Sequence, residues 1–96
     1  MHLQFEWDER KAGINLSKHG VSFYEAQTVF LDPLAYIFYN EAHSTGELQE
    51  IIIGHSSDGR LLLVCFTERE PRVVRIIGAR RATRRERNDY EENRHH

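Results

Sequence analysis

The sequence is poor in the residues that crosslink or interrupt a chain. It has one cysteine, Cys65, so no disulfide can form within it, and a reducing cytoplasm is the expected compartment. Because Cys65 lies within an apolar run, we expect a core residue without a reactive role. The two prolines, Pro33 and Pro71, are expected in turns. No apolar run is long enough to cross a bilayer, so no membrane association is expected.

Lysine is also scarce, and the two signs of charge are unevenly distributed. Only Lys11 and Lys18 are lysine, while residues 60–87 hold nine arginines and three glutamates. Residues 1–59 hold nine acidic and three basic residues, so the net charge of -2 conceals a strongly basic segment. Arginine binds phosphate through a planar, bidentate fork, which favours a polyanion such as RNA as the partner. The alternative is that these arginines are solvated surface charges.

The length of 96 residues predicts one domain, residues 1–92, followed by a frayed tail, residues 93–96. Hydrophobic periodicity and turn residues predict the order β-α-α-β-β-β-β-α. The elements are expected at residues 3–7, 8–19, 23–30, 34–39, 48–55, 60–67, 73–79 and 84–92. Short hairpin connections predict an antiparallel sheet, with two helices before it and one after it, in an α+β fold.

Several local signals define the ends of these elements. Gly20 is a plausible stop for the first helix. Ser22 with Glu25, and Thr83 with Glu86, match the capping-box pattern at the start of the second and third helices. The run at residues 61–66 is apolar on both faces, which is typical of a central strand with cover on each side.

The sequence has no recognisable metal-binding motif and no glycine-rich phosphate loop. Its histidines are too scattered for a linear zinc pattern, so no metal or other cofactor is expected. Metal-free acid–base chemistry or plain binding remains. Cleavage of RNA without metal needs a base for the 2′-hydroxyl proton, a cation for the phosphorane and an acid for the leaving 5′ oxygen.

Five residues at element ends are candidates for acid–base or phosphate chemistry. Lys18 and His19 end the first helix, where they either face a substrate or simply complement the helix dipole. Glu68 and Arg69 end the central strand, where they either act on a substrate or form weak surface pairs. Glu47, at a strand entrance, is either functional or an ordinary edge charge.

The second group of candidates lies in the basic segment. Arg75 shares an apolar strand face and therefore needs a partner, either a structural ion pair or a ligand. Tyr90 is either an acid or a packing residue with a wet hydroxyl. Five arginines cluster where the last strand leads into the last helix, a place that presents free backbone N–H groups to an anion. They are Arg80, Arg81, Arg84, Arg85 and Arg87.

Motifs along most of the chain, residues 3–92, resemble the BrnT family of bacterial toxins. The motifs are Phe5-Glu6-Trp7-Asp8 with Lys11, Asn15, Lys18-His19-Gly20-Val21-Ser22-Phe23, Glu25-Ala26, Asp32-Pro33, His43-Ser44, Gly46-Glu47, Ile53-Gly54, Thr67-Glu68-Arg69, Arg75-Ile76-Ile77, Ala79-Arg80-Arg81-Ala82-Thr83, Glu86-Arg87 and Tyr90-Glu91. Three of these motifs are specific in combination: Trp7-Asp8, Lys18-His19-Gly20-Val21 and Ala79-Arg80-Arg81-Ala82-Thr83.

The resemblance implies a RelE-like fold and a ribonuclease toxin that arrests translation without a metal. It also implies a BrnA-like antitoxin, which is a ribbon-helix-helix DNA-binding protein. The toxin would contact operator DNA only through that antitoxin. It points to Lys18, His19, Glu68, Arg69, Arg80 and Arg84 as catalytic residues. Contact with RNA would fall to Arg75, Arg81, Arg85 and Tyr90.

The sequence departs from the family pattern at two places. Gly78 stands where serine is expected, and Leu48-Gln49 stands where a charged residue is common. Two alternatives therefore stay open: a module that binds RNA or protein without cutting, and a degenerate toxin that represses an operon together with its antitoxin. We further hypothesise that the arginine surface is where the antitoxin docks.

Overall fold

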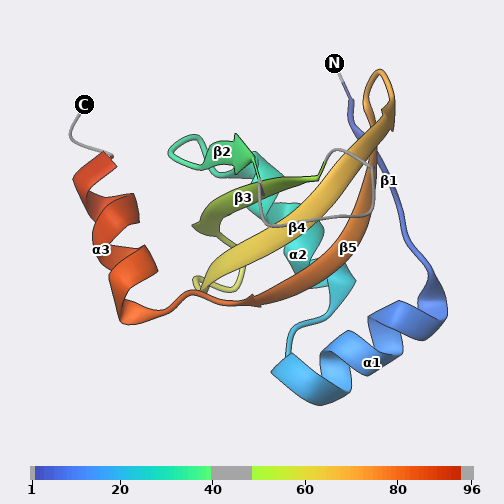
Figure 1. Ribbon diagram of the computed structural model, residues 1–96, viewed down its shortest axis with the longest axis horizontal. Helices are drawn as coiled ribbons and strands as arrows, with labels where there is room; N and C mark the ends of the chain where they lie inside the picture. Colours follow the sequence, from blue (N-terminus) through green and yellow to red (C-terminus); the bar gives the residue numbers. More distant parts are fainter. Residues whose placement is uncertain (1, 40–48, 94–96) are drawn as a thin grey trace.

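The computed structural model describes residues 2–39 and 49–93, which form five strands, three α-helices and one 3₁₀ helix (Figure 1). In chain order the elements are β1 (Gln4–Glu6), α1 (Glu9–His19), α2 (Phe23–Gln27), η1 (Thr28–Leu31), β2 (Tyr36–Tyr39), β3 (Glu50–His55), β4 (Leu61–Glu70), β5 (Val73–Arg81) and α3 (Arg84–Asn93). The predicted order is confirmed, although α3 includes Asn93, which was assigned to the tail. Glu47, Leu48 and the His43-Ser44 motif lie outside the described residues.

The strands form one sheet in the order β1-β5-β4-β3-β2. The pairs β2–β3, β3–β4 and β4–β5 are antiparallel, as predicted. Strand β1 joins this antiparallel main sheet at its edge and pairs parallel with β5. These two strands are far apart in the chain and no hairpin joins them, so no tight turn fixes their relative direction. The both-sided apolar strand β4 is central, as expected.

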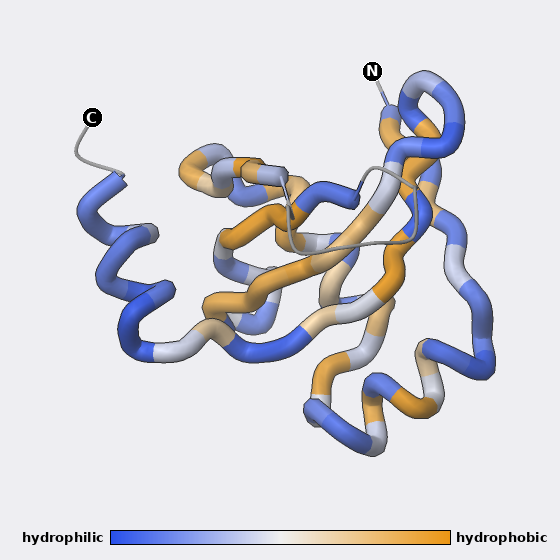
Figure 2. Tube along the Cα trace, in the orientation of Figure 1, coloured by the Kyte–Doolittle hydropathy of each residue, from blue (hydrophilic) through white to orange (hydrophobic). Residues whose placement is uncertain are grey.

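Each face of the sheet carries its own hydrophobic cluster. The larger cluster lies under α1, α2 and η1 and includes Phe23, Val29, Leu62 and Ile76, all almost completely buried. The smaller one lies on the opposite face, where Tyr90 of α3 packs on β3 and β4. Figure 2 shows the hydrophobic strands and the mostly hydrophilic α3. Because Tyr90 is the only buried residue of α3, this helix covers only one end of its face.

Helix α1 ends where the sequence predicted and begins one residue later than expected, because Asp8 caps the helix. The Asp8 side chain accepts hydrogen bonds from the backbone N–H groups of Arg10 and Lys11, which caps the N-terminus and lowers the pKa of Asp8. Gly20 ends the helix at φ 69°, a left-handed conformation that glycine adopts without a steric cost.

Helix α2 is shorter than predicted because its last turn is a 3₁₀ helix, η1. Its Ser22 cap is confirmed, since the hydroxyl accepts a bond from the Glu25 N–H at 3.0 Å. The predicted reciprocal bond from the Glu25 carboxylate is not what the structure shows. That carboxylate instead pairs with Arg60 and accepts the Ser56 hydroxyl at 2.7 Å. The Arg60 guanidinium lowers the pKa of Glu25.

Candidate functional site

The sheet face that carries α3 at one end has a hollow of about 280 Å³ beside it. Its lining comes from α1, β3, β4 and β5: Asn15, His19, Ile51, Leu63, Cys65, Gly78, Ala79 and Arg80. The floor is mostly apolar, while His19 and Arg80 supply a proton-exchanging group and a cation. Such a mixture suits a ligand with an apolar body and an anionic group.

Asn15 fixes the helix that carries His19 to the sheet. Its amide nitrogen donates to the carbonyl oxygens of Val21 and Ala79, both at 2.9 Å. Its amide oxygen accepts the Ala79 N–H at 3.1 Å. Asn15 therefore binds both backbone polar groups of Ala79, as a neighbouring strand would. His19 lies one helical turn further along α1, which brings it to the mouth of the hollow.

A second hollow, of about 220 Å³, shares Asn15 and His19 with the first. It is lined also by Lys11, Lys18, Ile14 and Ile77. We call the two adjoining hollows together the double hollow. Lys18 and His19, the predicted pair, are both exposed and line it. Lys11, which the sequence argument gave no role, adds a further cation to the same surface.

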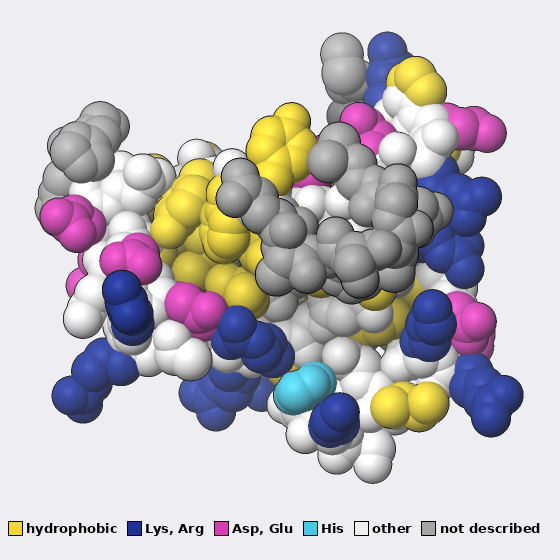
Figure 3. All heavy atoms as spheres, viewed as in Figure 1, with side chains coloured by type: hydrophobic (Ala, Val, Ile, Leu, Met, Phe, Trp, Pro, Cys, Tyr) yellow, Lys and Arg dark blue, Asp and Glu magenta, His cyan; other side chains and the backbone are white. Residues whose placement is uncertain are grey.

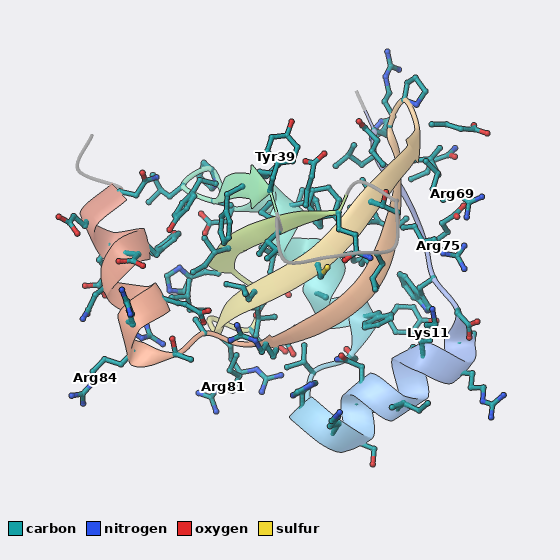
Figure 4. The ribbon with its side chains drawn as sticks, viewed as in Figure 1. Lys11, Tyr39, Arg69, Arg75, Arg81 and Arg84 are labelled. Carbon is teal, nitrogen blue, oxygen red and sulfur yellow. The ribbon has the colours of Figure 1, made fainter. Side chains whose placement is uncertain are left out.

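Arg75 of β5, Arg69 near the end of β4 and Lys11 of α1 all lie on the right-hand side of the molecule in Figure 4. The Arg75 guanidinium donates to the Glu6 carboxylate at 3.0 Å, so the predicted alternative of a structural ion pair is present. Both side chains remain about one-third or more exposed, which leaves Arg75 reachable by solvent.

Arg80 is held in a two-pronged ion pair with Glu86 of α3. Two guanidinium nitrogens donate to the two carboxylate oxygens, each at 2.8 Å. Glu86 also accepts the Thr83 N–H at 2.8 Å and its own N–H donates to the Thr83 hydroxyl, which confirms the predicted capping box. The Arg80 guanidinium is the main cause that lowers the pKa of Glu86 to about 2. Arg80 therefore reaches the hollow already partnered.

Two irregularities in the β4–β5 pairing separate other predicted residues from this site. Glu68 pairs with Val74, and Arg81 pairs with Leu62. Val74 and Leu62 are both buried under the N-terminal helices. Directly paired residues point to the same side of a sheet. Glu68 and Arg81 therefore point to the face opposite His19 and Arg80. Grouping them with His19 as one catalytic set does not match this arrangement.

The residues predicted on α3 also lie away from the hollow. Arg84 and Arg85 are exposed, and Figure 4 shows Arg84 directed away from the sheet. Tyr90 is 1% exposed, which favours the packing alternative over contact with RNA. The Tyr90 hydroxyl donates to the Asp32 carboxylate at 2.8 Å, and the His55 ring lies beside that hydroxyl.

Asn15 and Cys65 contribute to this site although the sequence did not predict it. Asn15 stood in a family motif but received no role, because its partners are distant in the chain. Cys65 is only half-buried and lines the hollow, where its thiol donates to the Gln49 side-chain oxygen at 3.3 Å. At Gly78, a Cβ atom would meet nothing closer than Asn15 Oδ1 at 3.8 Å, so glycine leaves the hollow deeper than a larger residue would.

Residues 2–39 and 49–93 contain no group of three or more His, Cys, Asp or Glu side chains placed to hold a metal ion. In the same part of the chain, every helix is too short or too polar to span a bilayer. The concentration of Lys and Arg side chains around the lower and right-hand parts of the molecule in Figure 3 gives the site its positive surroundings.

Comparison with known proteins assigns the chain to a family. Residues 7–86 match the family model described as the ribonuclease toxin, BrnT, of type II toxin–antitoxin systems. The fold is similar to a crystal structure of the Brucella abortus ribonuclease toxin BrnT, with a TM-score of 0.65 and 21% sequence identity. That alignment covers 85% of this chain and 99% of the Brucella chain. No curated relative matches the sequence. The chain therefore belongs to the BrnT family of type II ribonuclease toxins.

Proposed function

We propose that this chain is a metal-independent endoribonuclease that cuts RNA in the double hollow around His19. The observation that supports it is the meeting of His19, Lys18, Lys11 and Arg80 at one open, partly apolar surface. Histidine exchanges protons readily near neutral pH, and lysine and arginine bind phosphate. Cutting cellular RNA in the cytoplasm would arrest translation.

The reaction we propose needs no group beyond the RNA and the protein. A base removes the 2′-hydroxyl proton, the 2′ oxygen attacks the adjacent phosphorus, and the bond from phosphorus to the 5′ oxygen breaks. An acid then protonates the leaving 5′ oxygen, so the products are a 2′,3′-cyclic phosphate and a 5′-hydroxyl. In this proposal His19 takes one of the two proton-transfer roles, and nearby cations stabilise the phosphorane.

We further propose that the partner is a BrnA-like antitoxin with a ribbon-helix-helix DNA-binding part. The toxin would then approach operator DNA only through that antitoxin. This part of the proposal rests on membership of a type II toxin–antitoxin family.

A second candidate function is RNA binding without cleavage. It is favoured by the pairing of Arg80 with Glu86 and by the position of Glu68 on the opposite face. Both features leave fewer reactive groups at the hollow than the sequence suggested. A degenerate toxin that only assists its antitoxin in repression would behave in the same way.

Incubation of the purified protein with RNA in excess EDTA, followed by mapping of the cut ends, separates the two candidates. The ribonuclease proposal predicts 2′,3′-cyclic phosphate or 3′-phosphate ends. Intact RNA, together with salt-sensitive binding, would instead support the binding module or the degenerate toxin.

A further inference from the structure

A groove of about 430 Å³ separates the edge strand β2 from α3, at the end of the sheet face away from α1. It is lined by Tyr36 and Phe38 of β2 and by Asp89, Glu92 and Asn93 of α3. We call it the aromatic–acidic groove. Figure 3 shows hydrophobic side chains gathered beside α3, with acidic side chains along the helix.

The floor of the groove is a row of aromatic rings fixed from below. Tyr36 stacks on the buried Tyr90 ring, with centroids 6.3 Å apart and an interplanar angle of 16°. Phe38 lies next to Tyr36 at 6.0 Å and is 40% exposed. The Asp32 carboxylate accepts hydrogen bonds from the Tyr90 hydroxyl at 2.8 Å and from the backbone N–H of His55 at 2.7 Å. These bonds hold the Tyr90 ring, on which Tyr36 stacks, in place. A groove that is already ordered loses little entropy when a partner binds.

The walls of the groove on the α3 side are negatively charged. Residues 88–93 contain three carboxylates and no basic side chain. Asp89 and Glu92 line the groove beside the aromatic floor. Burial first, and then the charges of Asp89 and Glu86, raise the pKa of Tyr36. Phosphate would be repelled here, in contrast to the double hollow around His19. The same sheet face is thus cationic near α1 and acidic near the last six residues of α3, residues 88–93.

Tyr36 and Phe38 form adjoining apolar surface on an edge strand, and contiguous exposed apolar surface is typical of a site for a partner. Within the described sheet, β2 has a strand neighbour on one side only. Protein partners that fill such a groove supply an apolar side chain for the floor and cations for the rim. Charge complementarity therefore selects a basic, amphipathic segment over RNA.

We propose that the aromatic–acidic groove binds a basic, amphipathic segment of the antitoxin. One apolar side chain of that segment packs on Tyr36 and Phe38, while lysine or arginine side chains pair with Asp89 and Glu92. This inference rests on the proposed antitoxin partner. It adds a contact of opposite polarity to the arginine surface at which we expected the antitoxin to dock.

The test compares two charge reversals on the same helix. Glu92→Lys changes a groove wall, while Glu91→Lys changes an exposed neighbour that does not line the groove. The probes are a full-length cognate BrnA-like antitoxin and an alternating leucine–lysine peptide, each titrated against the whole chain by calorimetry. Thermal unfolding of both variants checks that they fold, and RNA cleavage should be unchanged in both.

We expect Glu92→Lys to weaken binding of both probes about tenfold or more, and Glu91→Lys to change it less than twofold. Phe38→Ala should weaken binding similarly and without any change of charge. Equal binding by the two lysine variants would overturn the groove proposal while leaving the antitoxin partnership intact. Failure of the unaltered chain to bind the antitoxin would instead refute that partnership, and the inference with it. Self-association lost only in Glu92→Lys would assign the groove to a second copy of the chain.

Discussion

Replacement of Glu86 by glutamine tests whether the Arg80–Glu86 ion pair fastens α3 to the sheet. The change keeps the size of the side chain and one oxygen that can accept the Thr83 N–H. It removes the charge that pairs with the Arg80 guanidinium at 2.8 Å. Because α3 buries only Tyr90 besides this pair, we expect a measurable loss of stability.

The pKa of Glu86 gives the size of the effect. It falls from 4.5 to about 2 on folding, chiefly because of the Arg80 guanidinium. At about 1.4 kcal/mol per pKa unit, this shift corresponds to roughly 3 kcal/mol at neutral pH. Since Glu86 and Arg80 are 27% and 40% exposed, solvent screens the pair, and we expect about 1.5–2 kcal/mol.

The pH dependence has a definite sign. A folded-state pKa below the unfolded value means that the stabilisation is complete above pH 4.5 and is lost as pH falls through about 2. Urea unfolding should therefore show Glu86→Gln less stable than the unaltered chain at pH 7. The two free energies of unfolding should converge near pH 2. A difference that stays constant across that range, or is absent at pH 7, would refute the reasoning.

Three other substitutions probe the packing around the site. Asn15→Ala removes three buried hydrogen bonds and should lower the free energy of unfolding by about 3 kcal/mol or more in urea titrations. Gly54→Ala should cost about 2 kcal/mol because its Cβ would lie 2.7 Å from another side chain, whereas Gly78→Ala should be nearly neutral; equal costs would contradict the geometry. Tyr90→Phe should lower the free energy of unfolding by about 1–2 kcal/mol, measured as a fall in melting temperature, because Asp32 loses a buried donor.

Local sequence signals predicted the parts of the fold that depend on neighbours in the chain. Helix α1 begins at a capping aspartate and ends at a left-handed glycine, and both signals lie within a few residues of the helix. Gly59, in the turn between β3 and β4, has φ 81°, a left-handed conformation that glycine adopts without a steric cost. The Thr83–Glu86 capping box is local too, and the structure shows both of its bonds.

The arrangement of the site depends on contacts that no local signal carries. Asn15 binds Ala79, 64 residues away, and nothing near Asn15 in the sequence announces that partner. Period-two counting also fails at the irregularities in the β4–β5 pairing, so Glu68 and Arg81 could not be assigned to a face. The basic segment is partly neutralised by distant acids, since Arg60 pairs with Glu25.

The central claim is that His19 transfers a proton during RNA cleavage in the double hollow. The most direct test measures single-turnover RNA cleavage and RNA affinity together, in EDTA, for His19→Ala. His2→Ala is the matched control. His2 is also exposed, but it lines a different hollow, beside Phe5 and Phe30. We predict that His19→Ala loses cleavage by about a hundredfold or more while RNA affinity stays within a few-fold, and that His2→Ala changes neither. Cleavage by His19→Ala at the rate of the unaltered chain would contradict the account.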